Sequence, residues 1–276
     1  MKSFLRLLCP LLLGLCSIVF LAPLLFVLTG SLMRPNEFAH TYGANALRFP
    51  ALVPRLASPA QYTALLLNTP SFLNAYWNSL LIASVICACQ LFFALPCAYG
   101  LSKLRFRGRR PLLFTYVVMM MLPFQVTMLP MYQLVKALNL LDSRWSLIIP
   151  EIFAPFTVFF LAQFLHRLPN ELIEAVRLES SSPFVLYRHL IVPLSMPGIV
   201  SSIILSFVET WNMVEKPLLY LSDMRTYPLS MLLYEAGNRA TATTLAGCVL
   251  YLVPVLLLWN CFKDDICTGI AQLQIK

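Results

Sequence analysis

Long apolar runs alternate with short polar segments along most of the chain. A helix that crosses a bilayer needs about 20 consecutive, mostly apolar residues. Six runs approach that length, so the pattern predicts an all-α membrane protein, with one six-helix transmembrane bundle that occupies residues 1–276 as a single domain. The predicted spans are residues 7–29, 80–101, 112–134, 147–165, 191–211 and 243–262.

The first apolar run follows two basic residues, Lys2 and Arg6, as the core of a secretory signal peptide does. The run is longer than the usual core, and no small-x-small cleavage pattern follows it. We therefore expect an uncleaved first span. The longest predicted loop comes next, at residues 31–75, and ends at Tyr76-Trp77, an aromatic pair typical of a membrane interface.

The composition supports lipid as the main solvent of the chain. Hydrophobic residues make up 59% of the sequence and charged residues only 12%, whereas a soluble domain has about 25% charged residues. So few charges would not cover the surface of a soluble protein of this size. The composition therefore excludes most classes of soluble protein and indicates that membrane lipid is a partner.

The net charge of +8 would, in a soluble protein, raise the question of nucleic-acid binding. In a membrane protein, basic residues gather in the loops that stay in the cytoplasm. The densest group directly follows the second predicted span: Lys103, Arg105, Arg107, Arg109 and Arg110. We therefore expect no nucleic-acid partner and both termini in the cytoplasm.

Two short amphipathic helices are predicted in the polar segment 167–192. Asn170 can cap the first helix, whose first turn holds Glu171 and Glu174 near the positive end of the helix dipole. Pro183, after a serine run, suits the first position of the second helix. The apolar faces consist of Leu172, Ile173 and Val176, and of Phe184, Tyr187 and Ile191. Such a pair either docks into a groove on another protein or lies on the membrane surface.

The same segment resembles the EAA loop of the permease subunits of ABC importers. Glu174-Ala175-Val176 fills the first part of that motif and Ile191-Val192-Pro193 the last, while Ser180 replaces the usual glycine. The resemblance implies that this loop contacts an ATPase subunit. The implied contact residues are Glu174, Ala175, Val176, Arg177, Glu179, Ser180 and Ser181.

Further landmarks are similar to the MalG-like permeases of carbohydrate importers. They are Asn78-Ser79, Leu104 to Arg109, Trp211-Asn212 with Pro217-Leu218, and a tail from Gly269 to Lys276 in which Leu273 replaces a family glycine. The resemblance implies a location in the bacterial cell membrane and a translocation path for a solute, expected to be a sugar or oligosaccharide. It also implies two ABC ATPase subunits, a second permease as heterodimer partner and an extracellular solute-binding protein. Gly269 and Lys276 would contact the ATPase.

No chemistry of the chain's own is expected. The sequence lacks the G-x-x-x-x-G-K-[ST] phosphate loop, and it shows no nucleophile–base set and no metal-ligand spacing. We therefore predict that the chain is not an enzyme and binds no cofactor itself, with ATP and magnesium held by the partner ATPase.

Ionisable groups inside a membrane generally serve a function, which makes Glu151, Glu209 and Asn212 candidates for the translocation path. A position at the outer interface, near Glu215 and Lys216, is the alternative for Glu151. Two alternatives for the whole chain also stay open: a MalG-like permease recruited to another cargo or to export, and a self-sufficient secondary carrier or membrane enzyme.

Overall fold

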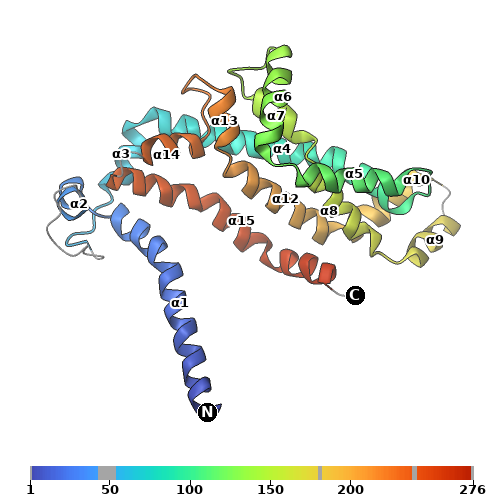
Figure 1. Ribbon diagram of the computed structural model, residues 1–276, viewed down its shortest axis with the longest axis horizontal. Helices are drawn as coiled ribbons and strands as arrows, with labels where there is room; N and C mark the ends of the chain where they lie inside the picture. The colour runs from blue at the N-terminus through green and yellow to red at the C-terminus, as the bar shows by residue number, and fades with distance from the viewer. Residues whose placement is uncertain (1, 43–53, 180–181, 238–240, 275–276) are drawn as a thin grey trace. The chain divides into compact units, whose positions relative to one another are not determined.

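The computed structural model describes residues 2–42, 54–179, 182–237 and 241–274, and all regular elements in these ranges are helices (Figure 1). The chain divides into two compact units. Unit 1 comprises Met1–Tyr76 and Met231–Val253, and unit 2 comprises Trp77–Ser230 and Pro254–Lys276. Three helices run from one unit into the other: α4 (Pro70–Lys103), α14 (Leu229–Gly237) and α15 (Ala242–Gln274).

Unit 1 also contains α1 (Lys2–Ser31), α2 (Pro35–Tyr42) and α3 (Ala60–Asn68). A small core of Met33, Phe38, Ala242 and Leu245 packs against Phe26 and Val27 of α1. Buried Gln61 joins two segments of this unit, because its amide donates to the Met33 carbonyl at 3.1 Å and its oxygen accepts from Thr243 at 3.2 Å. In its described part, the segment predicted as a loop at residues 31–75 thus contains α2, α3 and the beginning of α4.

Unit 2 holds the remaining helices. They are α5 (Arg109–Met121), α6 (Phe124–Ala137), α7 (Trp145–Ile152), α8 (Pro155–His166), α9 (Asn170–Glu179), α10 (Pro183–Leu186), the π-helix η1 (Tyr187–Ile191), α11 (Val192–Leu194), α12 (Met196–Trp211) and α13 (Glu215–Tyr220). The main core lies between α4, α8 and α12 and includes Ala98, Leu161, Leu165, Ile191 and Ile199.

Close packing between α8 and α12 depends on Gly198. A Cβ atom at this position would lie only 2.6 Å from the Phe164 ring. Small residues allow membrane helices to approach each other closely, and this contact is an example.

In the part of the chain that the structure describes, four stretches are long and apolar enough to cross a membrane: Leu12–Ser31, Pro70–Lys103, Trp145–His166 and Ala242–Lys263. Among the described residues, two bent helix pairs bring the number to six if each pair is one span. Apolar side chains on these helices face outward, as Phe20 (83% exposed) does. Such exposure fits a lipid environment.

The third predicted span, 112–134, is not one straight helix. α5 and α6 meet at an angle of 99°. Pro123 has no N–H group to donate, and it forces the preceding Leu122 into an extended conformation (ψ 123°). The break therefore follows from one proline, whereas Pro130 is accommodated inside α6.

The fifth predicted span is also bent, by 69°, where α11 meets α12. The helix before the bend widens into the π-helix η1, in which the Val192 N–H donates to the Tyr187 carbonyl. Two helices extend beyond the prediction: α4 begins at Pro70 rather than at residue 80, and α15 continues to Gln274 through the predicted tail.

Candidate functional site

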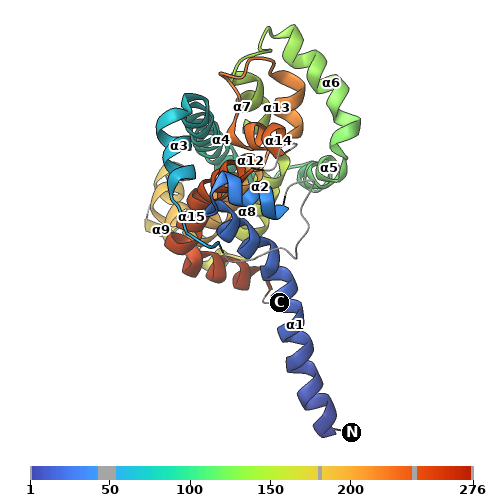
Figure 2. The same cartoon turned by 90° about the vertical axis from the view of Figure 1, so that its left-hand side faces the viewer.

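Two groups of predicted functional residues lie at opposite ends of the long helices of unit 2. α12 begins beside the segment 167–192 and ends at Trp211, next to Asn212, and its 16 residues span about 24 Å. α8 runs the other way, from the neighbourhood of Glu151 to His166, and packs against α12. α7 and α13 lie at one end of the unit, while α9 and α10 lie at the other (Figure 1). α7 and α13 are neighbours in both views (Figures 1 and 2).

A pocket of about 450 Å³ lies where α12, α7 and α13 meet. It is lined by Phe124, Glu151, Glu209, Thr210, Asn212, Met213, Val214, Glu215 and Lys216. The structure thus brings together all three residues that the sequence suggested for a translocation path. The lining holds three carboxylates against one ammonium group, so its net charge is negative.

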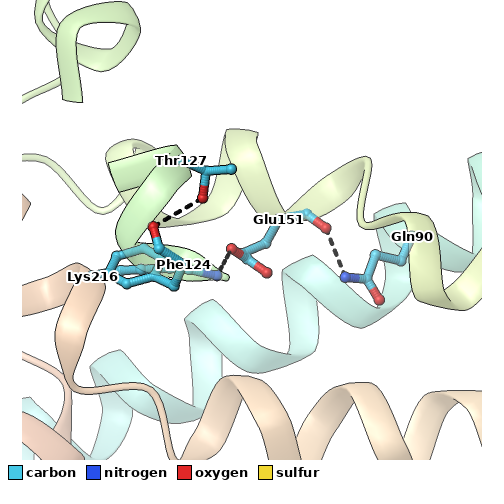
Figure 3. Close-up of polar contacts among 5 residues, drawn as sticks. All are labelled: Gln90, Phe124, Thr127, Glu151 and Lys216. Carbon is cyan, nitrogen blue, oxygen red and sulfur yellow. Dashed lines mark hydrogen bonds and ion pairs between the residues drawn. The ribbon is translucent and has the colours of Figure 1, made fainter. Parts of the chain in front are cut away.

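Glu151 and Lys216, both in the pocket lining, form an ion pair (Figure 3). The side chains are 13% and 28% exposed, respectively, so the pair is shielded from bulk solvent. The Lys216 ammonium also lies 5.9 Å from the centre of the Phe124 ring, within the range of a cation–π contact. Three separate helices, α6, α7 and α13, therefore meet at one charged group.

Glu151 stands at a break between two helices. α7 ends at Ile152 and α8 restarts at Pro155, which has no N–H group for the Glu151 carbonyl, and the Ala154 N–H donates to that carbonyl at 3.2 Å. Gln90 of α4 supplies a second donor, with its amide nitrogen 2.7 Å from the same carbonyl (Figure 3). The Gln90 oxygen in turn accepts from Thr157 at 3.1 Å, and Thr157 contacts Ser206 at 3.2 Å. Since Gln90, Thr157 and Ser206 are all buried, this network fixes the backbone that presents Glu151.

Side chains from distant segments also hold the loops around the pocket. Asp142, at a positive φ of 56°, donates its N–H to the Tyr220 carbonyl and accepts the Ser222 N–H at 2.6 Å. Buried Asn78 donates to the carbonyls of Arg225 and Tyr227. The neighbouring Ser79 accepts the Leu229 N–H at 2.7 Å. These contacts give the Asn78-Ser79 landmark a structural role.

Tyr220, at the end of α13, is 2% exposed, and its hydroxyl has no hydrogen-bond partner among the described residues. Burial raises the pKa of Tyr220 above its ordinary value, and the negative charge of Glu151 raises it further as the smaller of the two causes. The phenol therefore stays neutral beside the pocket at physiological pH.

At the other end, residues 167–192 form what we call the coupling segment. Ile173, Leu186 and Ile191 are buried in the core of unit 2 and attach the segment to α8 and α12. Glu174 is exposed, and Val176 is half-buried against that core. Leu172 and Phe184, which the sequence placed on the apolar faces available for docking, are 43% and 67% exposed. A charged group and apolar side chains are thus presented outward.

Several predicted contact residues lie wholly or partly outside the described structure. α9 includes the positions of Ala175, Arg177 and Glu179, and α15 that of Gly269, but the structure describes no side chain there. Ser180, Ser181 and Lys276 lie outside the described residues. Their proposed roles remain predictions.

The sequence did not single out Lys216, Phe124 or Gln90 as members of the site. Lys216 and Glu151 are 65 positions apart, and only the fold brings α13 to α7. The sequence marks Gln90 only as a polar residue inside an apolar run, and no local sequence pattern connects it to Glu151. Pairing across helices is decided by tertiary packing.

Residues 90–262 match the family model described as "binding-protein-dependent transport system inner membrane component". That match covers more than half of the chain, including the pocket and the coupling segment. The chain belongs to this family. Members are inner-membrane permeases of ABC importers, which work with ATPase and binding-protein partners and lack an ATPase site of their own.

Individual relatives agree with the family. The arabinooligosaccharides transport system permease protein AraQ of Bacillus subtilis (strain 168) is 30% identical over 264 residues, which cover 94% of this chain and 92% of AraQ. The diacetylchitobiose uptake system permease protein DasC of Streptomyces coelicolor is 27% identical and covers 72% of this chain and 74% of DasC.

A crystal structure of a bacterial ABC transporter involved in import of the acidic polysaccharide alginate contains a chain with the same fold. The two chains superpose with a TM-score of 0.80 at 20% sequence identity, over 96% of this permease and 97% of that chain. The match confirms the predicted all-α membrane fold.

Proposed function

We propose that this permease forms part of the path for a sugar or oligosaccharide and that its pocket contacts the solute. The observation that supports this most directly is the placement of the pocket and the coupling segment at the two ends of α12. A helix that reaches from one to the other can transmit a movement of the coupling segment to the pocket wall. Two relatives, AraQ and DasC, are named for oligosaccharide and diacetylchitobiose transport.

The assembly we propose has two ATPase subunits, a second permease and an extracellular solute-binding protein. Exposed Glu174 faces a basic group of the ATPase, and Leu172 and Phe184 pack into its surface. Both termini and the coupling segment lie in the cytoplasm, and the pocket faces outward. The basic residues next to the coupling segment fit this orientation, since Lys103 donates to the Leu168 carbonyl.

Charge reversal at Glu174 tests the coupling role. The complex is purified with its ATPase and sister permease, as wild type, as Glu174→Lys and as Glu235→Lys, a matched reversal at an exposed glutamate of α14. Reversal of a docked carboxylate should weaken ATPase retention or coupled hydrolysis at least about tenfold, whereas Glu235→Lys should behave as wild type. Equal retention and hydrolysis in all three would contradict the coupling role.

Uptake into proteoliposomes tests the pocket. Glu151→Gln leaves the Lys216 ammonium without its carboxylate, so we expect slower uptake of the transported oligosaccharide while the ATPase subunits stay bound. Unchanged uptake would remove the pocket from the path without affecting the coupling assignment. If the wild-type complex takes up no saccharide in the presence of the binding protein, the proposed solute class is contradicted.

A further inference from the structure

The short connection between α4 and α5 holds the densest positive charge in the chain. We call residues 103–110 the basic loop. Two of its five basic residues have contacts within unit 2: the Lys103 ammonium donates to the Leu168 carbonyl at 2.6 Å, and Arg109 lies 3.4 Å from the His166 ring. These contacts hold the loop against the end of α8.

The other three basic residues, Arg105, Arg107 and Arg110, are exposed, and none forms an ion pair with a described residue. Like charges at such short spacing repel one another, and no carboxylate of the described structure compensates them. The loop therefore presents a concentrated positive potential that suits an anionic partner.

Apolar side chains stand between the arginines. Leu104 is 44% exposed and Phe106 is 45% exposed, and α5 continues the outward apolar surface with Leu112 and Phe114. A solvated basic loop has no need of such side chains, whereas a segment at the boundary of a bilayer places arginine among headgroups and apolar rings among acyl chains. Because the loop joins two spans, it lies at a boundary of the bilayer, whichever side of the membrane it faces.

An open hollow of about 400 Å³ lies within the loop. Its lining residues are Arg105, Phe106, Gly108, Arg109, Arg110 and Pro111. Gly108 adopts a φ of 93°, a left-handed conformation that favours glycine, and so allows the sharp turn into α5. Guanidinium groups from both sides of this turn border one space, and guanidinium is well suited to bind phosphate oxygens in pairs.

We propose that the basic loop is a binding site for the headgroup of an anionic phospholipid. Its phosphate binds in the hollow between Arg105 and Arg110, and its acyl chains lie along Phe106 and the outer face of α5. The site is separate from the pocket and does not depend on the identity of the solute. The ATPase is a less suitable partner for the basic loop than a lipid. The exposed apolar side chains continue from the loop directly onto α5, which is part of a membrane span.

The test measures lipid retained by the complete transporter. The complex is reconstituted in nanodiscs of phosphatidylethanolamine and phosphatidylglycerol, released into mild detergent and weighed by native mass spectrometry. The variant is Arg105→Gln, Arg107→Gln and Arg110→Gln combined. Since each basic group near an anionic surface contributes about fivefold in affinity, the variant should lose the preference for phosphatidylglycerol almost completely.

A matched variant removes three exposed arginines elsewhere: Arg34→Gln, Arg144→Gln and Arg225→Gln. It loses the same net charge and should keep the preference. The corresponding arginine-to-lysine variant of the basic loop keeps the charge, so it should retain most of the preference. Retention of the ATPase subunits by the glutamine variant shows that this variant is folded.

Three results would overturn the proposal. The first is equal loss of phosphatidylglycerol in the basic-loop and control variants. The second is binding of inorganic phosphate that the glutamine variant of the basic loop loses, while its phosphatidylglycerol retention stays as in wild type, which identifies a site for a free anion. The third is loss of the ATPase subunits with lipid retention unchanged, which identifies a protein contact.

Discussion

Gln90 joins three helices of the permease through one side chain that is 3% exposed. Replacement by leucine removes one hydrogen bond each from the Glu151 carbonyl, which keeps the Ala154 N–H, and from the Thr157 hydroxyl, which keeps Ser206. The loss of one such hydrogen bond costs about 0.5–1.5 kcal/mol. We expect Gln90→Leu to lower the thermal stability of the purified complex and to slow uptake, because Glu151 shifts.

Gln163→Leu is the matched control for this prediction. Gln163 is a half-buried glutamine on α8 and has no hydrogen bond among the described residues. The Gln163→Leu variant should unfold near the wild-type temperature. Equal destabilisation by both substitutions would show that Gln90 has no particular role at the break between α7 and α8.

Asn78 has a similar role in a loop near the pocket. Its amide donates to the carbonyls of Arg225 at 2.8 Å and Tyr227 at 3.1 Å. Asn78→Ala should therefore release this loop, with a loss of about 1–3 kcal/mol and faster proteolysis between residues 221 and 228. Asn74→Ala, at an exposed position one turn earlier on α4, should leave the cleavage rate unchanged.

Sequence reasoning at this scale found the polar groups and missed their partners. Glu151, Glu209 and Asn212 were predictable because a charge or amide at the end of an apolar run is rare. Lys216 and Phe124 were not, since the ion pair and the ring contact join helices whose pairing no local pattern specifies. The resemblance of Asn78-Ser79 to a family landmark pointed to these residues without giving the loop contacts that explain them.

At the scale of helices, the contact between α8 and α12 depends on Gly198. The methyl group in Gly198→Ala would meet a ring that is itself 2% exposed and has little space to move. Overpacking of this kind costs about 1–3 kcal/mol. We expect a lower unfolding temperature, with uptake reduced more than ATPase retention, because α12 connects the two ends of unit 2.

Gly100→Ala on α4 is the control for that substitution. A Cβ atom at Gly100 has nothing within 4 Å, and alanine favours a helix over glycine. This variant should be as stable as wild type or slightly more so. A normal unfolding temperature for Gly198→Ala would contradict the close contact.

Helix breaks were harder to predict than helices. The apolar runs gave the approximate positions of the long helices, but several prolines lie inside those runs and only some interrupt them. Pro123 ends α5, whereas Pro96 and Pro254 lie within continuous helices. Whether a proline breaks a helix depends on neighbours that can satisfy the freed carbonyls, and those neighbours are set by the tertiary structure.

At the scale of the whole molecule, the orientation in the membrane is a testable proposal. A single cysteine is introduced at exposed Arg107 or at exposed Asp223, in a background whose eight native cysteines are replaced by serine. We expect a membrane-impermeant maleimide to label the Asp223→Cys variant in intact cells and the Arg107→Cys variant only after lysis. The reverse pattern would place the coupling segment outside and contradict the proposed topology.

The separation of the pocket from the coupling segment along α12 has a consequence for divergence among relatives. Substitutions at residues 209–216 can alter what the pocket accepts while the attachment of the coupling segment, through Ile173, Leu186 and Ile191, stays as it is. One ATPase could then serve several permeases that differ in cargo. Grafting residues 209–216 between permeases would be a practical way to redirect a transporter without rebuilding its motor.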